Sequence, residues 1–242
     1  MNYILQYHKK ITDGDIIVSK KVAAVYDYLY YKVNNPGKYI FDESKANRVI
    51  EFIQTFCKHG EGKSAGKPFI LELWQKALLS ALFGFVDKDT GLRQYRELIL
   101  IVARKNGKSV FASAIANYLL YADGEEGAQL YSAATKKDQA KIIWESSKKM
   151  IKKSPELSRY AKIYINEIKC SIGDGIFKPL SSESNTLDGL NVHASFIDEL
   201  HAIKDKNLYD VIVDGMSARQ QPLSIITSTS GMIRDNIYDL KY

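Results

Sequence analysis

The run Asn106-Gly107-Lys108-Ser109 has the composition of a loop that binds phosphate. It follows a short apolar run, ELILIVA at 97–103, and precedes a helical pattern, VFASAIANYLLYA. A glycine at such a junction lets the backbone approach an anion, and the start of the helix turns free N–H groups toward it. Lys108 can reach the terminal phosphates of a nucleotide, and the Ser109 hydroxyl can coordinate Mg²⁺. The segment therefore predicts a site for a nucleoside triphosphate and Mg²⁺.

The loop departs from the usual phosphate-loop pattern at one position. That pattern has a glycine five positions before the Gly-Lys pair, where this chain has Val102. A bare Gly-Lys-Ser is frequent by chance, so the prediction depends on the strand before it and the helix after it. Arg104, just before Lys105, could stabilise charge on a transferring phosphoryl group. A surface arginine paired with a neighbouring acid explains that residue equally well.

Two adjacent carboxylates, Asp198 and Glu199, end a second buried-strand pattern, HASFIDE at 193–199. Ligand sites of open α/β sheets lie at the carboxyl ends of the strands, so this pair is expected beside the phosphate loop. Asp198 would hold Mg²⁺ through water, and Glu199 would orient and deprotonate the attacking water. The alternative is an acidic pair that caps a helix after a strand.

Two further segments fit a nucleotide site. Gln75, in LELWQ, carries an amide that could read the hydrogen-bonding edges of adenine, which favours ATP as the nucleotide. The pattern LSIITSTS ends in a row of hydroxyls, Thr227 to Ser230, that could sense loss of the γ-phosphate. Taken alone, the first is a surface glutamine on an amphipathic helix and the second is a polar turn.

Helical and strand patterns divide the chain into an N-terminal helical region, 1–66, and a core, 67–242. The first region contains VAAVYDYLYYKV and ESKANRVIEFIQTFCKH, with a helix start near Asp42 or Ser44. Expected strands of the core are 97–103, 128–134, 161–166, 167–172, 175–182, 193–199 and 223–230; expected helices are 71–86, 110–122, 136–153 and 205–219. This alternation predicts an α/β fold with a mainly parallel central sheet and helices on both faces.

Charge and cysteine usage narrow the class of protein. The net charge is +6, and residues 136–178 hold eleven Lys/Arg against five Asp/Glu. Such a stretch is either a solvated helix face or a contact for a polyanion. Cys57 and Cys170 lack metal-ligand spacing and are interpreted as reduced thiols of a cytosolic protein. No apolar run approaches the ~18 residues of a membrane span, and no membrane partner is expected. The histidines form no zinc pattern, and no G-x-S-x-G is present.

Five segments in this order resemble one family, the ATPase domain of the large terminase subunit of tailed phages. They are FDESKANRVIEFIQTFCKHGEGKSAGKPFILELWQ, ARKNGKS, AATKKDQA, LDGLNVHASFIDELH and SARQQPLSIITSTSG. In that family the phosphate loop has the form R-x-x-G-K-S/T without a leading glycine, so Val102 agrees with the resemblance. The resemblance implies a RecA/ASCE-type P-loop ATPase fold preceded by N-terminal helices.

The resemblance also implies roles for individual residues. Lys108 and Ser109 correspond to the Walker A lysine and hydroxyl, within a loop that includes Lys105, Asn106 and Gly107. Arg104 corresponds to a loop arginine proposed to act in catalysis, and Gln75 to the adenine-contacting Q motif. The remaining correspondences are Asp198 and Glu199 with the Walker B acids and Ser228, Thr229 and Ser230 with the coupling motif. That motif is commonly T-T-A-G, from which S-T-S-G departs at two positions.

Members of the family assemble as rings, usually of five subunits, on the portal protein of an empty capsid. They pull double-stranded DNA inside by hydrolysing ATP, in partnership with a small terminase subunit. The implied location is the host cytoplasm, at the portal vertex of the procapsid. Full-length subunits also carry a C-terminal nuclease domain, which is absent from these 242 residues, so nuclease activity is not expected.

Two other functions are compatible with the sequence. Asp-Glu-Leu-His at 198–201 matches the DExH box of superfamily-two helicases, and a nucleotide-binding or DNA-binding module without catalysis is a third reading. If the basic stretch lines the channel of a ring, four lysines could contact DNA phosphates: Lys148, Lys149, Lys152 and Lys153. Arg159 and Arg219 are both candidates for an arginine that reaches the neighbouring subunit's site.

Overall fold

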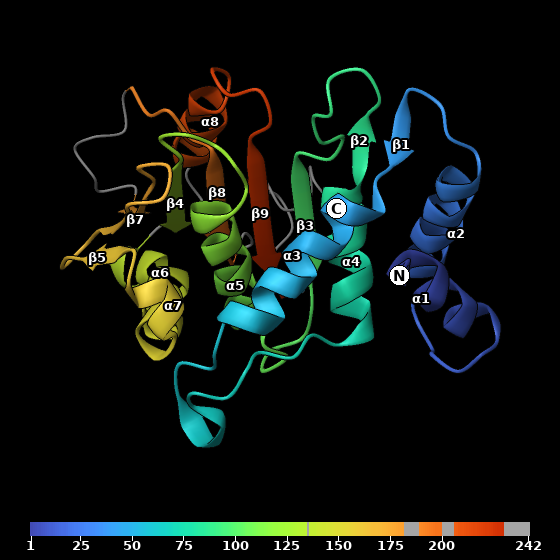
Figure 1. The fold of residues 1–242 in the computed structure, drawn as a ribbon, viewed down its shortest axis with the longest axis horizontal. Coiled ribbons are helices and arrows are strands. Elements are labelled where there is room, and N and C mark those ends of the chain that lie inside the picture. Colours follow the sequence, from blue (N-terminus) through green and yellow to red (C-terminus); the bar gives the residue numbers. More distant parts are fainter. Residues whose placement is uncertain (135, 182–188, 200–205, 230–242) are drawn as a thin grey trace. The chain divides into compact units, whose positions relative to one another are not determined.

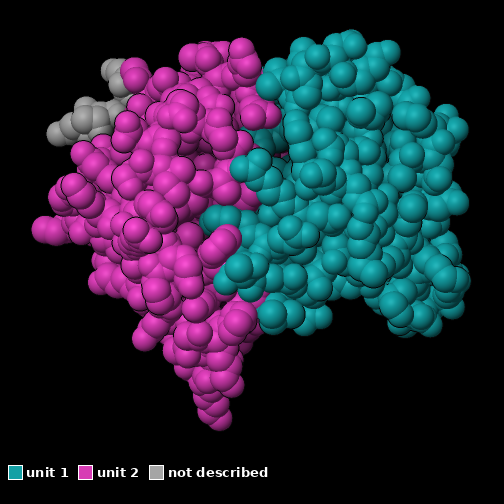
Figure 2. All heavy atoms as spheres, in the orientation of Figure 1, with its two compact units in different colours: residues 1–55, 70–96 teal, residues 56–69, 97–242 magenta. Residues whose placement is uncertain are grey.

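The computed structural model describes residues 1–134, 136–181, 189–199 and 206–229 (Figure 1). Contacts group the chain into two compact units, shown in different colours in Figure 2. The first unit comprises residues 1–55 and 70–96, and the second comprises 56–69 and 97–242. The domain boundary between residues 66 and 67 stays a prediction.

Helices dominate the first unit. Its elements are α1 (Tyr3–Thr12), α2 (Lys20–Asn34), β1 (Tyr39–Phe41), α3 (Glu43–Phe56), α4 (Leu73–Gly84) and β2 (Phe85–Asp87). Polar side chains begin three of the helices. The Asn2 side-chain amide oxygen, the Ser19 hydroxyl and the Asp42 carboxylate accept backbone N–H groups in the first turns of α1, α2 and α3, respectively. Such caps satisfy N–H groups that have no partner inside the helix. The helix start expected near Asp42 is therefore confirmed.

An apolar cluster packs α1, α2 and α4 of this unit against one another. It brings Ile4 and Tyr7 of α1 against Tyr26 and Leu29 of α2, with residues of α4 and Phe85 beneath them. The spacing of three and four residues within each helix places these side chains on one face. Strands β1 and β2 pair antiparallel, and neither is predicted by the sequence pattern because three residues carry no usable periodicity.

The second unit is built on a seven-stranded sheet of order β3-β9-β8-β4-β7-β6-β5. Its strands are β3 (Glu97–Ile101), β4 (Gln129–Ala134), β5 (Ala161–Ile163), β6 (Ile168–Cys170), β7 (Ile176–Ser181), β8 (Ala194–Asp198) and β9 (Leu223–Ser228). Pairing is parallel from β3 through β7, and antiparallel for β7-β6 and β6-β5. The predicted α/β class with a mainly parallel sheet is confirmed.

Helices cover both faces of this sheet. On one face, α8 (Lys206–Gly215) packs its Leu208 and Ile212 onto Tyr131, Ile197 and Ile226 of three neighbouring strands. The other face carries α5 (Lys108–Tyr121) and α6 (Lys137–Lys153), followed by the short α7 (Pro155–Ser158) (Figure 1). Alternate residues of a strand point to opposite faces, so each central strand contributes apolar side chains to both layers.

The strand order determines which loops meet. The phosphate loop follows β3, the Asp198-Glu199 pair ends β8, and β9 lies hydrogen-bonded between these two strands. All three run parallel, so their carboxyl ends open on the same edge. In doubly wound sheets this edge is where ligands bind. We call it the carboxyl edge of the sheet.

The two cysteines provide a test of the packing in the second unit. Cys57 and Cys170 are both buried and unbridged. Burial is the main reason why the pKa of the Cys57 thiol is raised to about 12. Burial also raises the pKa of the Cys170 thiol. At mildly alkaline pH both thiols should therefore stay protonated and inaccessible to a disulfide reagent. We expect no rapid labelling of the native chain and labelling of both thiols in concentrated guanidinium chloride. Rapid labelling of a native thiol would contradict the buried placement.

Candidate nucleotide site

The phosphate loop has the backbone shape of an anion cradle. Lys105 and Gly107 adopt left-handed conformations, with φ of 66° and 71°, and Gly107 is the N-cap of α5. Apart from its two chain neighbours, no atom of the described residues lies within 4 Å of where a Cβ of Gly107 would stand, and none of their side chains caps this helix start. The helix is 14 residues long, so its first N–H groups carry a substantial positive dipole. Open space above uncapped N–H groups fits a phosphate.

Lys108 forms an ion pair with Glu199. The ammonium donates to Oε1 at 2.7 Å, and the two side chains are 9% and 27% exposed. A buried lysine requires a partner charge because an isolated buried ammonium costs several kcal/mol. The predicted Walker A lysine and the predicted base are thus in direct contact at the carboxyl edge.

Asp198 sits between two hydroxyls. Its Oδ2 accepts from Ser109 Oγ at 3.2 Å, while its Oδ1 accepts from Thr227 Oγ1 at 2.6 Å and from the Glu199 backbone N at 3.1 Å. Carboxylate and hydroxyl oxygens are ligands that suit Mg²⁺, which usually takes one or two carboxylates and completes its shell with phosphates and water. Ser109 and Asp198 therefore fit a magnesium site that a nucleotide would complete.

Glu199 is held in a strained backbone conformation. Its φ is 54°, in the left-handed region that costs a non-glycine residue about 1–2 kcal/mol. Its Oε2 accepts from Thr229 Oγ1 at 3.2 Å, opposite the bond to Lys108. The left-handed backbone and the two side-chain contacts together fix the Glu199 carboxylate at the carboxyl edge, beside Lys108.

The side chains of the predicted hydroxyl row do not all contact the acids in the structure. Thr227 and Thr229 contact the two acids, whereas Ser228 lies between them on the opposite face of β9 and donates to the Thr229 carbonyl at 2.9 Å. Thr227 is not among the residues that the resemblance selects. Strand periodicity gives the signal that finds it, since residues two apart share a face. Ser230 and His201 lie outside the described residues.

The other predicted residues are placed less directly. Arg104, Lys105 and Asn106 are exposed on the phosphate loop, and the Asn106 amide donates to the Ala103 carbonyl at 3.1 Å. Gln75 belongs to the first unit, where its Oε1 accepts the Glu72 backbone N–H at 2.9 Å within a capping box of α4. Roles for Gln75 in binding adenine and for Arg104 in catalysis stay predictions.

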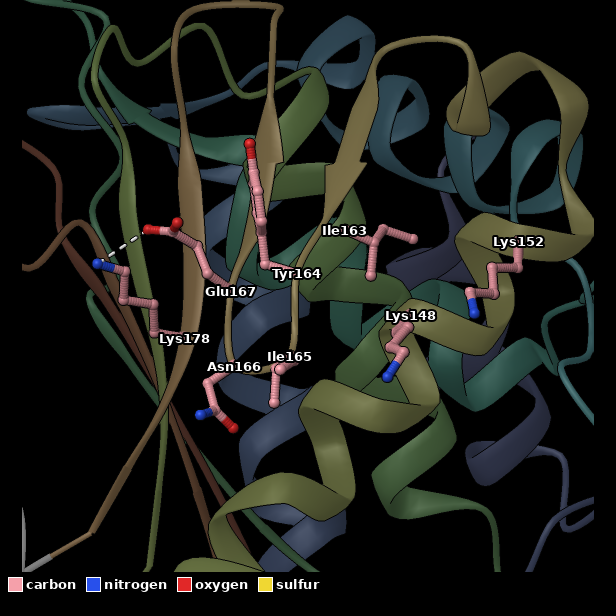
Figure 3. A pocket seen from close by; sticks show the side chains of 8 residues that line it. All are labelled: Lys148, Lys152, Ile163, Tyr164, Ile165, Asn166, Glu167 and Lys178. Atoms are coloured by element: carbon pink, nitrogen blue, oxygen red, sulfur yellow. Dashed lines mark ion pairs between the residues drawn. The ribbon is translucent and has the colours of Figure 1, made fainter.

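A large open pocket of the second unit lies against α6 and the β5–β6 turn, and it is lined by none of the residues predicted to bind nucleotide (Figure 3). Its volume is about 720 Å³, and it is lined by Lys148, Lys152, Ile163, Tyr164, Ile165, Asn166, Glu167 and Lys178. Figure 3 shows Lys148 and Lys152 extending from α6 and an ion pair between Lys178 and Glu167, at 2.9 Å. We call this pocket the basic pocket. It does not include the phosphate loop, whose candidate role follows from its backbone and side-chain geometry.

Comparison with known proteins agrees with this geometry. The family described as terminase large subunit, ATPase domain, matches residues 73–242, well over half of the chain. The terminase large subunit of Enterobacteria phage HK97 is 30% identical over 194 residues, covering 77% of this chain and 37% of the relative.

The crystal structure of the HK97 large terminase superposes with a TM-score of 0.70 and 26% identity. That match covers 81% of this chain and 40% of the other, so this chain spans well under half the length of both relatives. No helix in the described part of the chain is long and apolar enough to cross a membrane. Sequence and fold lead to one conclusion: the chain belongs to the family of terminase large-subunit ATPase domains.

Proposed function

We propose that the chain hydrolyses ATP at the carboxyl edge and that hydrolysis drives double-stranded viral DNA into a procapsid. One observation carries the proposal: Lys108, Ser109, Asp198 and Glu199 converge there from two strand ends. Phosphoryl transfer needs this set, namely a cation at the β- and γ-phosphates, a metal-binding hydroxyl and acid, and a base for water. A module that only binds nucleotide has no need of a base aimed at the γ-phosphate.

The Lys108–Glu199 pair suggests how the site is switched on. A triphosphate seated over the start of α5 offers Lys108 more negative charge than one carboxylate does. Lys108 then turns to the phosphates and frees Glu199 to accept a proton from the attacking water. Mg²⁺ held between Ser109 and Asp198 would neutralise charge on the β- and γ-phosphates. Because Thr229 is hydrogen-bonded to Glu199, a movement of the Glu199 carboxylate would be transmitted to the end of β9.

A homo-oligomeric ring, with five subunits the expected number, is proposed on the portal protein, with the small terminase subunit as a further partner. The site of assembly would be the portal vertex in the host cytoplasm. The two candidates for an arginine acting in the neighbouring site differ in their contacts. Arg219 bonds Glu125, Asn191 and the Glu126 and Gly127 carbonyls, at 2.7–3.1 Å, beyond the amino ends of β4 and β8. Arg159 is exposed near Tyr160, so we assign it the intersubunit role.

DNA contact is assigned to the basic pocket and the adjoining face of α6. Of the four lysines expected there, Lys148 is paired with Glu145 at 3.1 Å and Lys149 with Glu61 at 2.5 Å. Lys152 and Lys153 are exposed at the end of α6 and form no ion pair within the described residues. Unpaired ammonium groups can neutralise phosphates without first breaking another contact, so these two carry the proposal.

Replacing Glu199 by glutamine tests the site. Turnover should fall about 10²–10⁴-fold because the base is lost. ADP should bind more tightly because Lys108 loses its charged partner; an ion pair worth ~0.5–1 kcal/mol corresponds to a change of about 2–5-fold. Phosphate release and calorimetric titration measure the two effects.

Asp13→Asn, which removes an exposed carboxylate paired with Lys9, is the matched control and should change neither quantity. Phosphate release is measured over a range of protein concentrations. A rate per subunit that rises with concentration and disappears in Glu199→Gln indicates a site completed by a neighbour. Equal turnover in wild type and Glu199→Gln would refute Glu199 as the base.

Substituting the two arginines should give opposite phenotypes. Arg219→Ala should lower the free energy of unfolding by about 2–3 kcal/mol, because the substitution leaves the Glu125 carboxylate without the guanidinium that donates to it. Arg159→Ala should leave stability within ~0.5 kcal/mol but cut turnover about 10³-fold at the concentration plateau. Chemical denaturation and phosphate release check both. A stable Arg219→Ala variant that has lost turnover would reverse the assignment.

Charge reversal at Lys152 and Lys153 tests the DNA contact. The double variant Lys152→Glu/Lys153→Glu should lower affinity for duplex DNA of any sequence. It should also reduce the slope of log affinity against log salt by about 2, one phosphate contact per lysine. Fluorescence anisotropy at several salt concentrations measures both. Lys20→Glu/Lys88→Glu has the same net charge on exposed positions of the first unit and should keep the wild-type slope. Identical slopes for wild type and the Lys152/Lys153 variant would remove the assignment.

A further inference from the structure

Strand β9 lies between the strand that leads into the phosphate loop and the strand that ends in the two acids. In its register with β8, Thr227 stands directly opposite Asp198. Thr227 is fully buried, and its hydroxyl donates to Asp198 Oδ1 at 2.6 Å, the shortest of the three bonds to that carboxylate. A hydroxyl at this position therefore has one evident partner, the acid expected to hold the metal.

The bonds to Asp198 are unequal on its two oxygens. Oδ1 accepts two donors from the protein interior, the Thr227 hydroxyl and the Glu199 backbone N–H. Oδ2 accepts the Ser109 hydroxyl, on the side of the phosphate loop. With Oδ1 occupied, rotation about the Cβ–Cγ bond would break both interior bonds. The carboxylate is thus held with one particular oxygen toward Ser109.

We propose that Thr227 is a positioning residue for the divalent cation, acting through Asp198. Its hydroxyl occupies Oδ1 and so presents Oδ2, beside the Ser109 hydroxyl, to the metal that accompanies the nucleotide. The proposal rests on the proposed ATPase function and adds a residue outside the phosphate loop, the acid pair and the motif at 228–231. Partners that orient a metal ligand commonly change metal affinity by about 10–100-fold when they are removed.

A second pair on the same strands shows what a purely structural hydroxyl looks like. Ser195 and Ser224 stand opposite each other in the register of β8 and β9 and are bonded at 3.1 Å. Both are buried, and they lie three positions nearer the amino ends, on the face of the sheet opposite to that of Thr227 and Asp198, because residues an odd number apart point to opposite faces. Removing that bond perturbs the same two strands without touching the acid.

The test measures how much Mg²⁺ improves ADP binding, as the ratio of the ADP dissociation constant in EDTA to that in Mg²⁺. Calorimetric titration of the whole chain gives both constants without hydrolysis. In Thr227→Val, which keeps shape and strand preference but removes the donor, the ratio should fall at least about 10-fold. ADP affinity in EDTA should stay at the wild-type value, because the phosphate cradle is intact.

Three comparisons distinguish positioning from general damage. Thr227→Ser restores a donor and should recover most of the ratio, and Ser224→Ala should keep all of it. Asp198→Asn should lose the ratio, and adding Thr227→Val to it should cause no further loss, since the two act as a unit. If Thr227→Val does not fold, Thr227→Cys, a weak donor of similar size, replaces it with the same expectations.

Two outcomes for Thr227→Val would overturn the positioning role. A Thr227→Val variant that keeps the wild-type ratio overturns the proposal, as does one that loses ADP affinity equally in EDTA and in Mg²⁺. Either result leaves the proposed ATPase function intact, because wild type still binds ADP with Mg²⁺. Wild-type protein that binds no ADP under either condition would instead overturn the proposed function, and this inference with it.

Discussion

The contact between the Lys108 ammonium and the Glu199 carboxylate is the interaction on which the candidate site depends. Lys108 begins a buried helix, and a charge in that position is stable only beside an opposite charge. Glu199 supplies it from the end of β8, across β9, and adopts a left-handed backbone to do so. A phosphate that binds Lys108 must therefore compete with this carboxylate. On the proposed mechanism, its binding frees Glu199 to act as the base.

Strand β9 brings the parts of the candidate site together. Because β9 pairs with both β3 and β8, its end lies next to the phosphate loop and next to the acids. Alternation along the strand then sends Thr227 to Asp198 and Thr229 to Glu199, while Ser228 faces the layer covered by α8. One strand thereby contacts the predicted metal-binding acid and the predicted base through residues two positions apart. A shift of β9 by one residue would replace both contacts at once.

Features remote from the carboxyl edge have different roles. Arg219 fastens segments beyond the amino ends of the central strands, through donors to side-chain and backbone oxygens. A guanidinium with all these partners stabilises the subunit and is poorly placed to leave it. The basic pocket, by contrast, combines open space with lysines at the end of α6. The candidate site lies at one edge of the sheet, and none of its residues lines the basic pocket.

Local spacing in the sequence was sufficient for the fold class, for most helices and strands, and for the phosphate loop, because each depends on neighbours within about ten residues. The Gly107-Lys108-Ser109 run and the Asp198-Glu199 pair were recognisable for the same reason. The sequence alone did not reveal that β9 lies between β3 and β8, that Thr227 bonds Asp198, or that Arg219 is engaged while Arg159 is exposed. Those facts join residues 29 to 127 positions apart. Only the tertiary structure decided them, because partners across a sheet are set by strand order and register, which depend on packing of the whole core.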